Sequence, residues 1–289
     1  MARGSPRAAR AGLALCLTLA LAGCGSTPPP QSDAELRRER MVELNDRARA
    51  AVSRGELRRA VVYYREALRL AEAIEDFRTI GLNSLNLAAV LQSLGEPEQA
   101  HRALERVIAT PSRFDAAVVG EAAGRRSYLA LQAGQLDVAE QWLQRSEKDC
   151  KPPACRRDTA LVSLRALLTL ERGAPAEARK LAARALAASR SEGNREEEAN
   201  ALRVDGRAAA ALGDRAGAMA ALNQALALDK QLALPHKIGL DLLALAEVEL
   251  AGGGREAARD YAQRALDVSR ATGNRQQQET SLKLLERAK

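Results

Sequence analysis

A short block of small residues recurs along most of the chain at an almost constant spacing. In every copy a glycine is followed five residues later by an alanine, and the glycines are Gly55, Gly95, Gly134, Gly173, Gly213 and Gly253. Successive glycines are 40, 39, 39, 40 and 40 residues apart. A fixed period of this length is typical of repeat proteins, in which each repeat is one supersecondary unit that stacks on its neighbours.

Further small residues stand at fixed offsets from each glycine. Seven residues before it are Ala48, Ala88, Ser127, Ala166, Gly206 and Ala246, and twelve residues after it are Ala67, Val107, Ser146, Ala185, Ala225 and Ala265. Small residues on both sides of a glycine indicate two helices that cross closely, the first ending in a left-handed C-cap. We therefore predict helical hairpins with turns near residues 55, 95, 134, 173, 213 and 253.

Together with Tyr64, Leu104, Leu143 and Leu222, nine residues after four of the glycines, these positions resemble the tetratricopeptide repeat (TPR) family over roughly residues 41–270. One position departs from the family pattern: its apolar residue is Leu87 or Leu245 in two repeats, but Arg47, Arg126, Arg165 and Asp205 in the others. The resemblance implies an all-α, right-handed helical solenoid of about six hairpins over 33–289, with a capping helix over 275–288. An aromatic content of 2% also argues against sandwiches and base-stacking surfaces.

The N-terminus has the pattern of an export signal. Arg3, Arg7 and Arg10 precede an apolar stretch over 11–22, which is too short to cross a bilayer comfortably. The stretch ends in Leu-Ala-Gly-Cys at 21–24, which resembles the lipobox of bacterial lipoproteins. We expect a signal peptide over 1–23 and a lipidated Cys24 that begins a Pro-rich tether over 24–32.

The lipobox resemblance implies a diacylglycerol thioether and an amide-linked acyl chain on Cys24, and we expect no other cofactor. In lipoproteins of Gram-negative bacteria, an Asp directly after the lipidated cysteine resembles a signal for retention in the inner membrane. This chain has Gly25 at that position. We therefore expect an outer-membrane lipoprotein that faces the periplasm. In an organism with a single membrane, the same signal implies a lipoprotein at the cell surface.

Two cysteines, Cys150 and Cys155, flank a Lys-Pro-Pro-Ala segment between the third and fourth hairpins. Because an exported protein meets an oxidising compartment, we expect them to form a disulfide. The only histidines, His101 on an expected helix and His236 in an expected loop, are far apart in the sequence and do not predict a zinc site.

The sequence contains no motif that predicts catalysis. It has no phosphate-binding loop, HExxH or Gly-x-Ser-x-Gly, so we expect neither an enzyme nor a small-molecule substrate. Of the formal net charge of +7, three charges belong to the arginines of the leader. The remaining excess, spread over a helical surface, does not predict a nucleic-acid partner.

In TPR proteins the first helices of the hairpins line a groove that holds an extended peptide or a partner helix. Carried over by position, the groove residues are Asn45, Arg49, Asn86, Gln92, Tyr128, Gln132, Asn200, Arg203, Arg207 and Glu247. Leu82, Leu85, Leu167, Leu170, Leu240 and Leu243 would make parts of the same face apolar. Each polar residue could equally be an ordinary solvated position. As groove residues, Asn86, Arg203 and Arg207 are expected to matter little for folding.

The sequence is compatible with two functions. The first is a membrane-anchored adaptor of the cell envelope, which binds an envelope protein or peptide in the groove. The alternative is a structural subunit, or a pilotin-like assembly factor, of a fixed envelope complex in pilus, secretion or outer-membrane assembly. In that case the convex face and the capping helix, and not the groove, would be buried against the partner.

Overall fold

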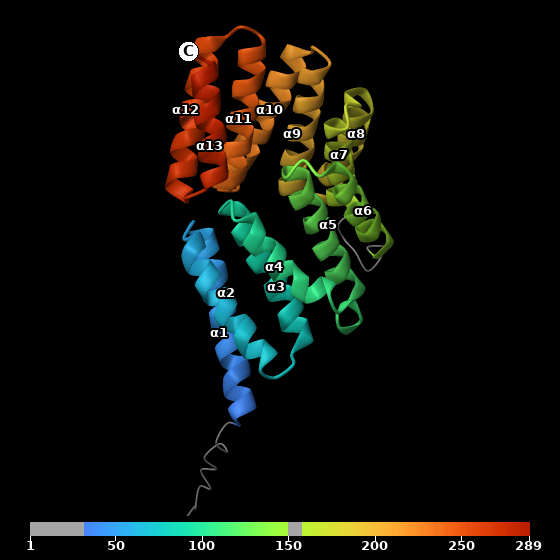
Figure 1. The fold of residues 1–289 in the computed structure, drawn as a ribbon, viewed down its shortest axis with the longest axis vertical. Coiled ribbons are helices and arrows are strands. Elements are labelled where there is room, and N and C mark those ends of the chain that lie inside the picture. Colours follow the sequence, from blue (N-terminus) through green and yellow to red (C-terminus); the bar gives the residue numbers. More distant parts are fainter. Residues whose placement is uncertain (1–31, 150–157) are drawn as a thin grey trace, which may run out of the picture. The chain divides into compact units, whose positions relative to one another are not determined.

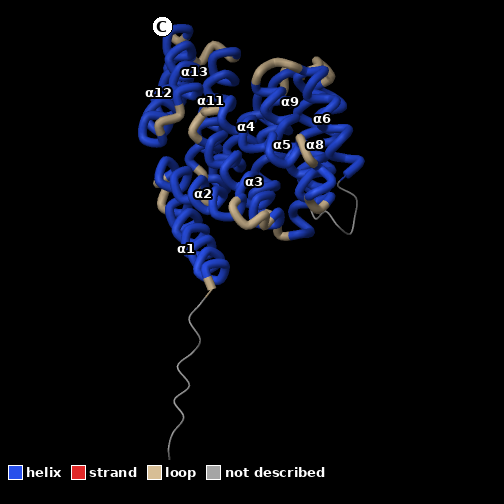
Figure 2. Tube along the Cα trace, turned by 60° about the horizontal axis from the view of Figure 1, so that its bottom comes forward, coloured by secondary structure: helices blue, strands red, loops and turns tan. Residues whose placement is uncertain are grey.

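The computed structural model describes residues 32–149 and 158–289, and its regular elements in these ranges are helices (Figures 1 and 2). Cys24, Cys150 and Cys155 lie outside the described residues, so their lipidation and disulfide remain predictions. The helices are α1 (Asp33–Ser53), α2 (Leu57–Glu72), α3 (Phe77–Ser93), α4 (Pro97–Ile108), a 3-10 turn η1 (Pro111–Arg113), α5 (Ala116–Gln132), α6 (Leu136–Asp149), α7 (Asp158–Glu171), α8 (Pro175–Glu192), α9 (Arg195–Ala211), α10 (Arg215–Gln231), α11 (Pro235–Ala251), α12 (Arg255–Thr272) and α13 (Arg275–Arg287).

Successive helices pack as hairpins. The pairs are α1 with α2, α3 with α4, α5 with α6, α7 with α8, α9 with α10 and α11 with α12, while α13 packs on α11 and α12. Each hairpin also contacts the next one, so that one repeat is stacked on another along the chain (Figure 1). The all-α solenoid predicted from the repeat is confirmed.

The turn inside each hairpin has the conformation that the repeated glycine predicts. Gly55, Gly95, Gly134, Gly173, Gly213 and Gly253 all have positive φ, between 69° and 80°. The turns from α8 to α9 and from α12 to α13 also use a left-handed glycine, Gly193 and Gly273. The turns from α2 to α3 and from α10 to α11 instead place Glu75 and Ala233 at φ 52°. This left-handed conformation costs a residue with a Cβ about 1–2 kcal/mol.

The small residues of the repeat lie where the helices cross. The alanines, serines and Val107 that stand seven residues before and twelve residues after each turn glycine are at most 2% exposed. Gly206 shows why size matters here, because a Cβ on it would lie 2.6 Å from Cγ of Leu222. Where a serine replaces alanine it bonds across the crossing: the Ser127 hydroxyl donates to the carbonyl of Ala139 at 2.7 Å.

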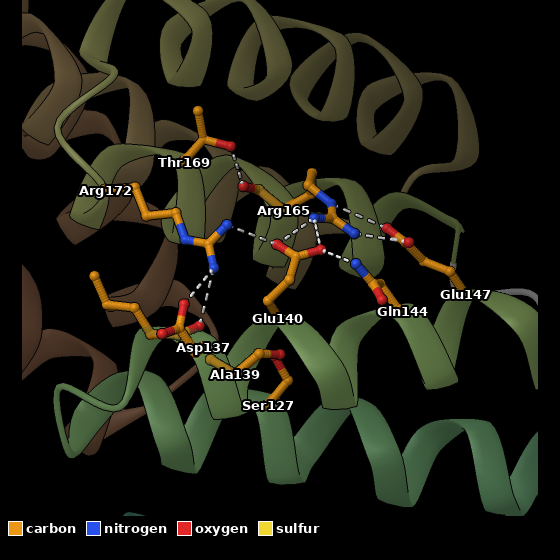
Figure 3. Close-up of polar contacts among 10 residues, drawn as sticks. Ser127, Asp137, Ala139, Glu140, Gln144, Glu147, Arg165, Thr169 and Arg172 are labelled. Carbon is orange, nitrogen blue, oxygen red and sulfur yellow. Dashed lines mark hydrogen bonds and ion pairs between the residues drawn. The ribbon is translucent and has the colours of Figure 1, made fainter.

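Three of the four charged residues at the family's apolar position form ion pairs with the preceding hairpin. Arg165 on α7 forms ion pairs with Glu140 and Glu147 on α6, at 2.6 and 2.7 Å, and Arg172 also contacts Glu140 at 3.3 Å (Figure 3). Burial acts to raise the pKa of Glu140, but hydrogen bonds from Arg165 and Gln144 outweigh it and lower that pKa. Ion pairs therefore join the third and fourth hairpins where the family pattern has an apolar contact.

Two of the other departures follow the same rule. Arg126 on α5 pairs with Glu105 on α4 at 2.9 Å, and Asp205 on α9 pairs with Arg179 on α8 at 3.2 Å. Leu87 and Leu245, which keep the family's residue type, are buried. This position therefore faces the preceding hairpin, and both apolar and ionic pairs can occupy the interface.

Candidate functional site

A cavity of about 610 Å³ lies along the first helices of the later hairpins. Most of its lining comes from α5, α7, α9, α11 and α13, and α3 contributes Gln92. A volume of this size falls in the range that ligand-binding pockets usually have. The cavity is the candidate site because it has room for a binding partner and combines apolar with polar side chains.

Leucines form the apolar part of the lining. They are Leu131 on α5, Leu161, Leu164 and Leu167 on α7, and Leu240 and Leu243 on α11. Residues three or four positions apart share a helix face, which explains why each helix presents its leucines together. Among the other leucines expected on this face, Leu85 is buried in the core, and Leu82 and Leu170 are not among the lining residues.

Seven of the polar residues expected in the groove line the cavity: Gln92, Tyr128, Gln132, Asn200, Arg203, Arg207 and Glu247. Asn45 and Arg49 on α1 and Asn86 on α3 do not. Burial raises the pKa of Tyr128, whereas the nearby charges of Arg203 and Arg207 act to lower it. The phenol is therefore a neutral group that can donate and accept hydrogen bonds at physiological pH.

Arg203 is held by two buried carboxylates from the neighbouring helices. Its guanidinium forms ion pairs with Asp229 on α10 and with Asp241 on α11, the second at 2.6 Å. Both aspartate side chains are 0% exposed and that of Arg203 is 11% exposed. Burial raises the pKa of both carboxyl groups, that of Asp241 to about 7, although Arg203 acts in the opposite direction.

This cluster corrects one expectation. Arg203 lines the cavity, but its guanidinium links α9 to α10 and α11, so replacing it is expected to affect folding as well as binding. A buried charge that loses its partner is strongly destabilising. Arg207 fits the original expectation better, because its ion pair with Glu171 at 2.7 Å is one-third exposed.

His236 is also in a different setting from the one expected. It is the second residue of α11, which begins at Pro235, rather than part of a loop. Burial lowers its pKa to about 3, so the ring is neutral. The amide nitrogens of Asn274 and Gln277 lie 3.1 and 3.2 Å from Nδ1, which assigns the proton to Nε2 because an amide nitrogen can only donate.

The amide of Asn274 makes a second, longer-range contact. Its Nδ2 donates to the carbonyl of Ser93 at 3.0 Å, which joins the turn before α13 to the end of α3. The Asn274 side chain also accepts a hydrogen bond from the backbone of Gln277 and so caps α13. One side chain thus helps to start the last helix and connects it with the second hairpin.

The sequence did not predict several of the lining residues, among them Leu161, Leu164, Glu171 and Lys237. Leu164 carried a usable signal, since it precedes Leu167 by three residues and shares its helix face. Within residues 32–149 and 158–289, no group of three or more His, Cys, Asp or Glu side chains could hold a metal ion.

No family model and no curated protein sequence matches the chain. Solved structures do match it. A Rap protein complexed with Competence and Sporulation Factor has a TM-score of 0.63 and 14% identity over 87% of this chain and 70% of that one. A chain of the APC/C hetero-tetramer Cut9–Hcn1 has a TM-score of 0.57 and 18% identity over 89% of this chain and 46% of that one.

A third structure is a signal-transduction ATPase from Pyrococcus horikoshii with a tetratricopeptide repeat sensor. Its TM-score is 0.54, with 17% identity over 88% of this chain and 38% of that one. The chain thus spans less than half the length of two of these three solved chains. These likenesses concern the backbone, and together with the helical hairpins they show that the chain has the fold of a TPR solenoid.

Proposed function

We propose that the chain is a binding scaffold, which holds a segment of a partner protein in the cavity lined by α5, α7, α9, α11 and α13. The observation that carries this proposal is the composition of the cavity lining. Leu161, Leu164, Leu167, Leu240 and Leu243 offer apolar contacts beside the polar groups of Tyr128 and Gln132. A partner with apolar anchors gains free energy from burying them, and the polar groups orient its backbone.

The fold neighbours support this use of the fold by analogy. The Rap protein is complexed with Competence and Sporulation Factor, so that protein with a similar backbone binds another molecule. Function resides in the site and not in the fold, so the analogy alone does not identify the partner of this chain.

We further propose that the scaffold works in the bacterial cell envelope and is anchored by lipid on Cys24. The Arg-rich leader and the Leu-Ala-Gly-Cys sequence support the proposal. In the part of the chain that the structure describes, no helix has the length and apolar character to cross a membrane. Cys24→Ser is expected to move the protein from the membrane pellet to the soluble fraction after a high-salt wash; persistence in the pellet would contradict a lipid anchor.

Site-specific photo-crosslinking in cells tests the binding scaffold. A photoreactive amino acid is placed at Gln132, which lines the cavity, and in a matched variant at Val62 on α2, which is 62% exposed and is not a lining residue. We expect one discrete crosslinked partner from position 132 and none from position 62.

The opposite pattern would favour the structural subunit. If position 62 crosslinks a partner that also copurifies stoichiometrically through harsh washes, while position 132 stays unlabelled, the outer helices carry the interface. Crosslinking from neither position would contradict a binding scaffold in the cavity.

A further inference from the structure

The basic side chains that line the cavity are already neutralised by the protein. Arg125 pairs with Glu121 at 2.8 Å, Arg207 with Glu171 at 2.7 Å, and Lys237 with Glu196 at 2.8 Å. The fourth, Arg203, lies between two aspartates, as described above. An acidic partner would therefore have to displace an internal carboxylate before it could pair with any of these cations.

The acidic side chains of the lining outnumber the basic ones. Glu197 and Glu247 line the cavity in addition to the paired glutamates, and neither has an ion-pair partner among the residues that the structure describes. The Glu247 side chain is exposed to solvent at the cavity, so a bound partner can reach it. Partial desolvation by the surrounding protein raises its pKa, although the charges of Arg207 and Arg287 act to lower it. Because this carboxylate is accessible and forms no ion pair with the described residues, a cation on the partner would stabilise its charged form.

Glu247 stands on the same helix face as part of the apolar wall. Leu240, Leu243 and Glu247 on α11 are three and four residues apart, and all three line the cavity. With a rise of about 1.5 Å per residue, Leu240 and Glu247 are about 10 Å apart along the helix. An extended peptide covers this distance in about three residues, at about 3.3 Å per residue.

We propose that the segment bound in the cavity is an extended peptide that carries an apolar side chain and, about three residues away, an Arg or Lys that pairs with Glu247. This inference rests on the proposed binding function and specifies its partner. The apolar side chain packs against Leu240 and Leu243, and the cation pairs with the carboxylate. The amides of Gln92 and Gln132 in the same cavity can bond to the donors and acceptors of a peptide backbone.

Three fluorescent nine-residue peptides test the inference on the full chain carrying Cys24→Ser. They share one leucine and otherwise Ala and Ser, and have Arg, Gln or Glu three residues from the leucine; each is made in both chain directions. Fluorescence anisotropy measures affinity, and the photoreactive residue at position 132 reports whether the peptide occupies the cavity. We expect the Arg peptide to bind about tenfold more tightly than the Gln peptide, and the Glu peptide to bind most weakly.

Glu247→Gln is expected to abolish the preference for Arg over Gln, by weakening binding of the Arg peptide about tenfold. Glu98→Gln, which changes an exposed glutamate on α4 outside the cavity lining, is the matched control and is expected to keep the preference. If the Gln or Glu peptide labels position 132 as well as the Arg peptide does, or if Glu247→Gln keeps the preference, the inference is wrong and the binding scaffold stands. If no peptide labels position 132, both are contradicted.

Discussion

Replacing Arg203 with methionine should destabilise the protein far more than a surface substitution would. Methionine keeps most of the side-chain length and removes the charge, which leaves Asp229 and Asp241, both 0% exposed, without their cation. Removing one partner of a buried ion pair typically costs about 3–5 kcal/mol.

An independent estimate gives a similar magnitude. The variant can relieve the charge only by taking up about one more proton than the wild type. Protonating a carboxyl group of ordinary pKa at pH 7 costs roughly 4 kcal/mol, at about 1.4 kcal/mol for each pH unit. For a chain of this length, such a loss lowers the midpoint of thermal unfolding by about 8–16 °C.

Chemical and thermal unfolding followed by far-UV circular dichroism measures the effect. Arg207→Met is the control, because its ion pair with Glu171 is 35% exposed on both sides and is expected to contribute about 0–1 kcal/mol. The decrease in the free energy of unfolding caused by Arg203→Met should also be smaller at pH 5 than at pH 7, because the extra proton is taken up more easily at the lower pH. If Arg203→Met unfolds like Arg207→Met at pH 7, Arg203 does not hold the three helices together.

Other expectations follow from the helix crossings, the turns, the buried carboxylate and the cysteines. Gly206→Ala should lower the free energy of unfolding by about 1–2 kcal/mol, because overpacking against the buried leucine of α10 exceeds the helix-propensity gain; an unchanged urea midpoint would contradict a tight crossing. Ala233→Gly should raise that free energy by up to about 1 kcal/mol by relieving its positive φ, and a lower midpoint would show that the turn is not strained. The pKa of Asp241 is raised to about 7 in the folded protein, so the folded state binds the proton more tightly than the unfolded state does. Proton binding at Asp241 therefore contributes fully to the free energy of unfolding at low pH, and this contribution is lost as the pH rises through about 7. Asp241→Asn should therefore flatten the pH dependence of the unfolding midpoint between pH 5 and 8, whereas an unchanged slope would assign that dependence to another group. Under non-reducing conditions Cys150 and Cys155 should resist thiol labelling, and free reaction of both would exclude the disulfide.

The hairpins were predictable because close helix crossings admit few residue types. The helix backbones approach one another at Gly206 and at the alanines of the repeat. The positions of these small residues in the sequence therefore predict where the helices cross. The role of Arg203 was not predictable in the same way. Its partners, Asp229 and Asp241, are 26 and 38 residues away, and nothing in the repeat pattern pairs an arginine with two acids from later helices.

The candidate site was predictable only in part. Positions carried over from the family placed Tyr128, Gln132 and Glu247 on the cavity, but they also included Asn45, Arg49 and Asn86, which the cavity does not reach. A position in the repeat identifies the helix face and does not tell how far along the stack the cavity extends. That extent depends on how the later hairpins pack.

The hydrogen bond from Asn274 to the carbonyl of Ser93 changes how unfolding of the last helix and of the second hairpin should be coupled. It spans 181 residues, whereas the inter-hairpin ion pairs described above span tens of residues. In an ordinary repeat array each end frays independently, because stability is a sum of neighbouring terms. Here, opening the turn before α13 removes a partner from the end of α3, so amide hydrogen exchange in the two regions should rise and fall together.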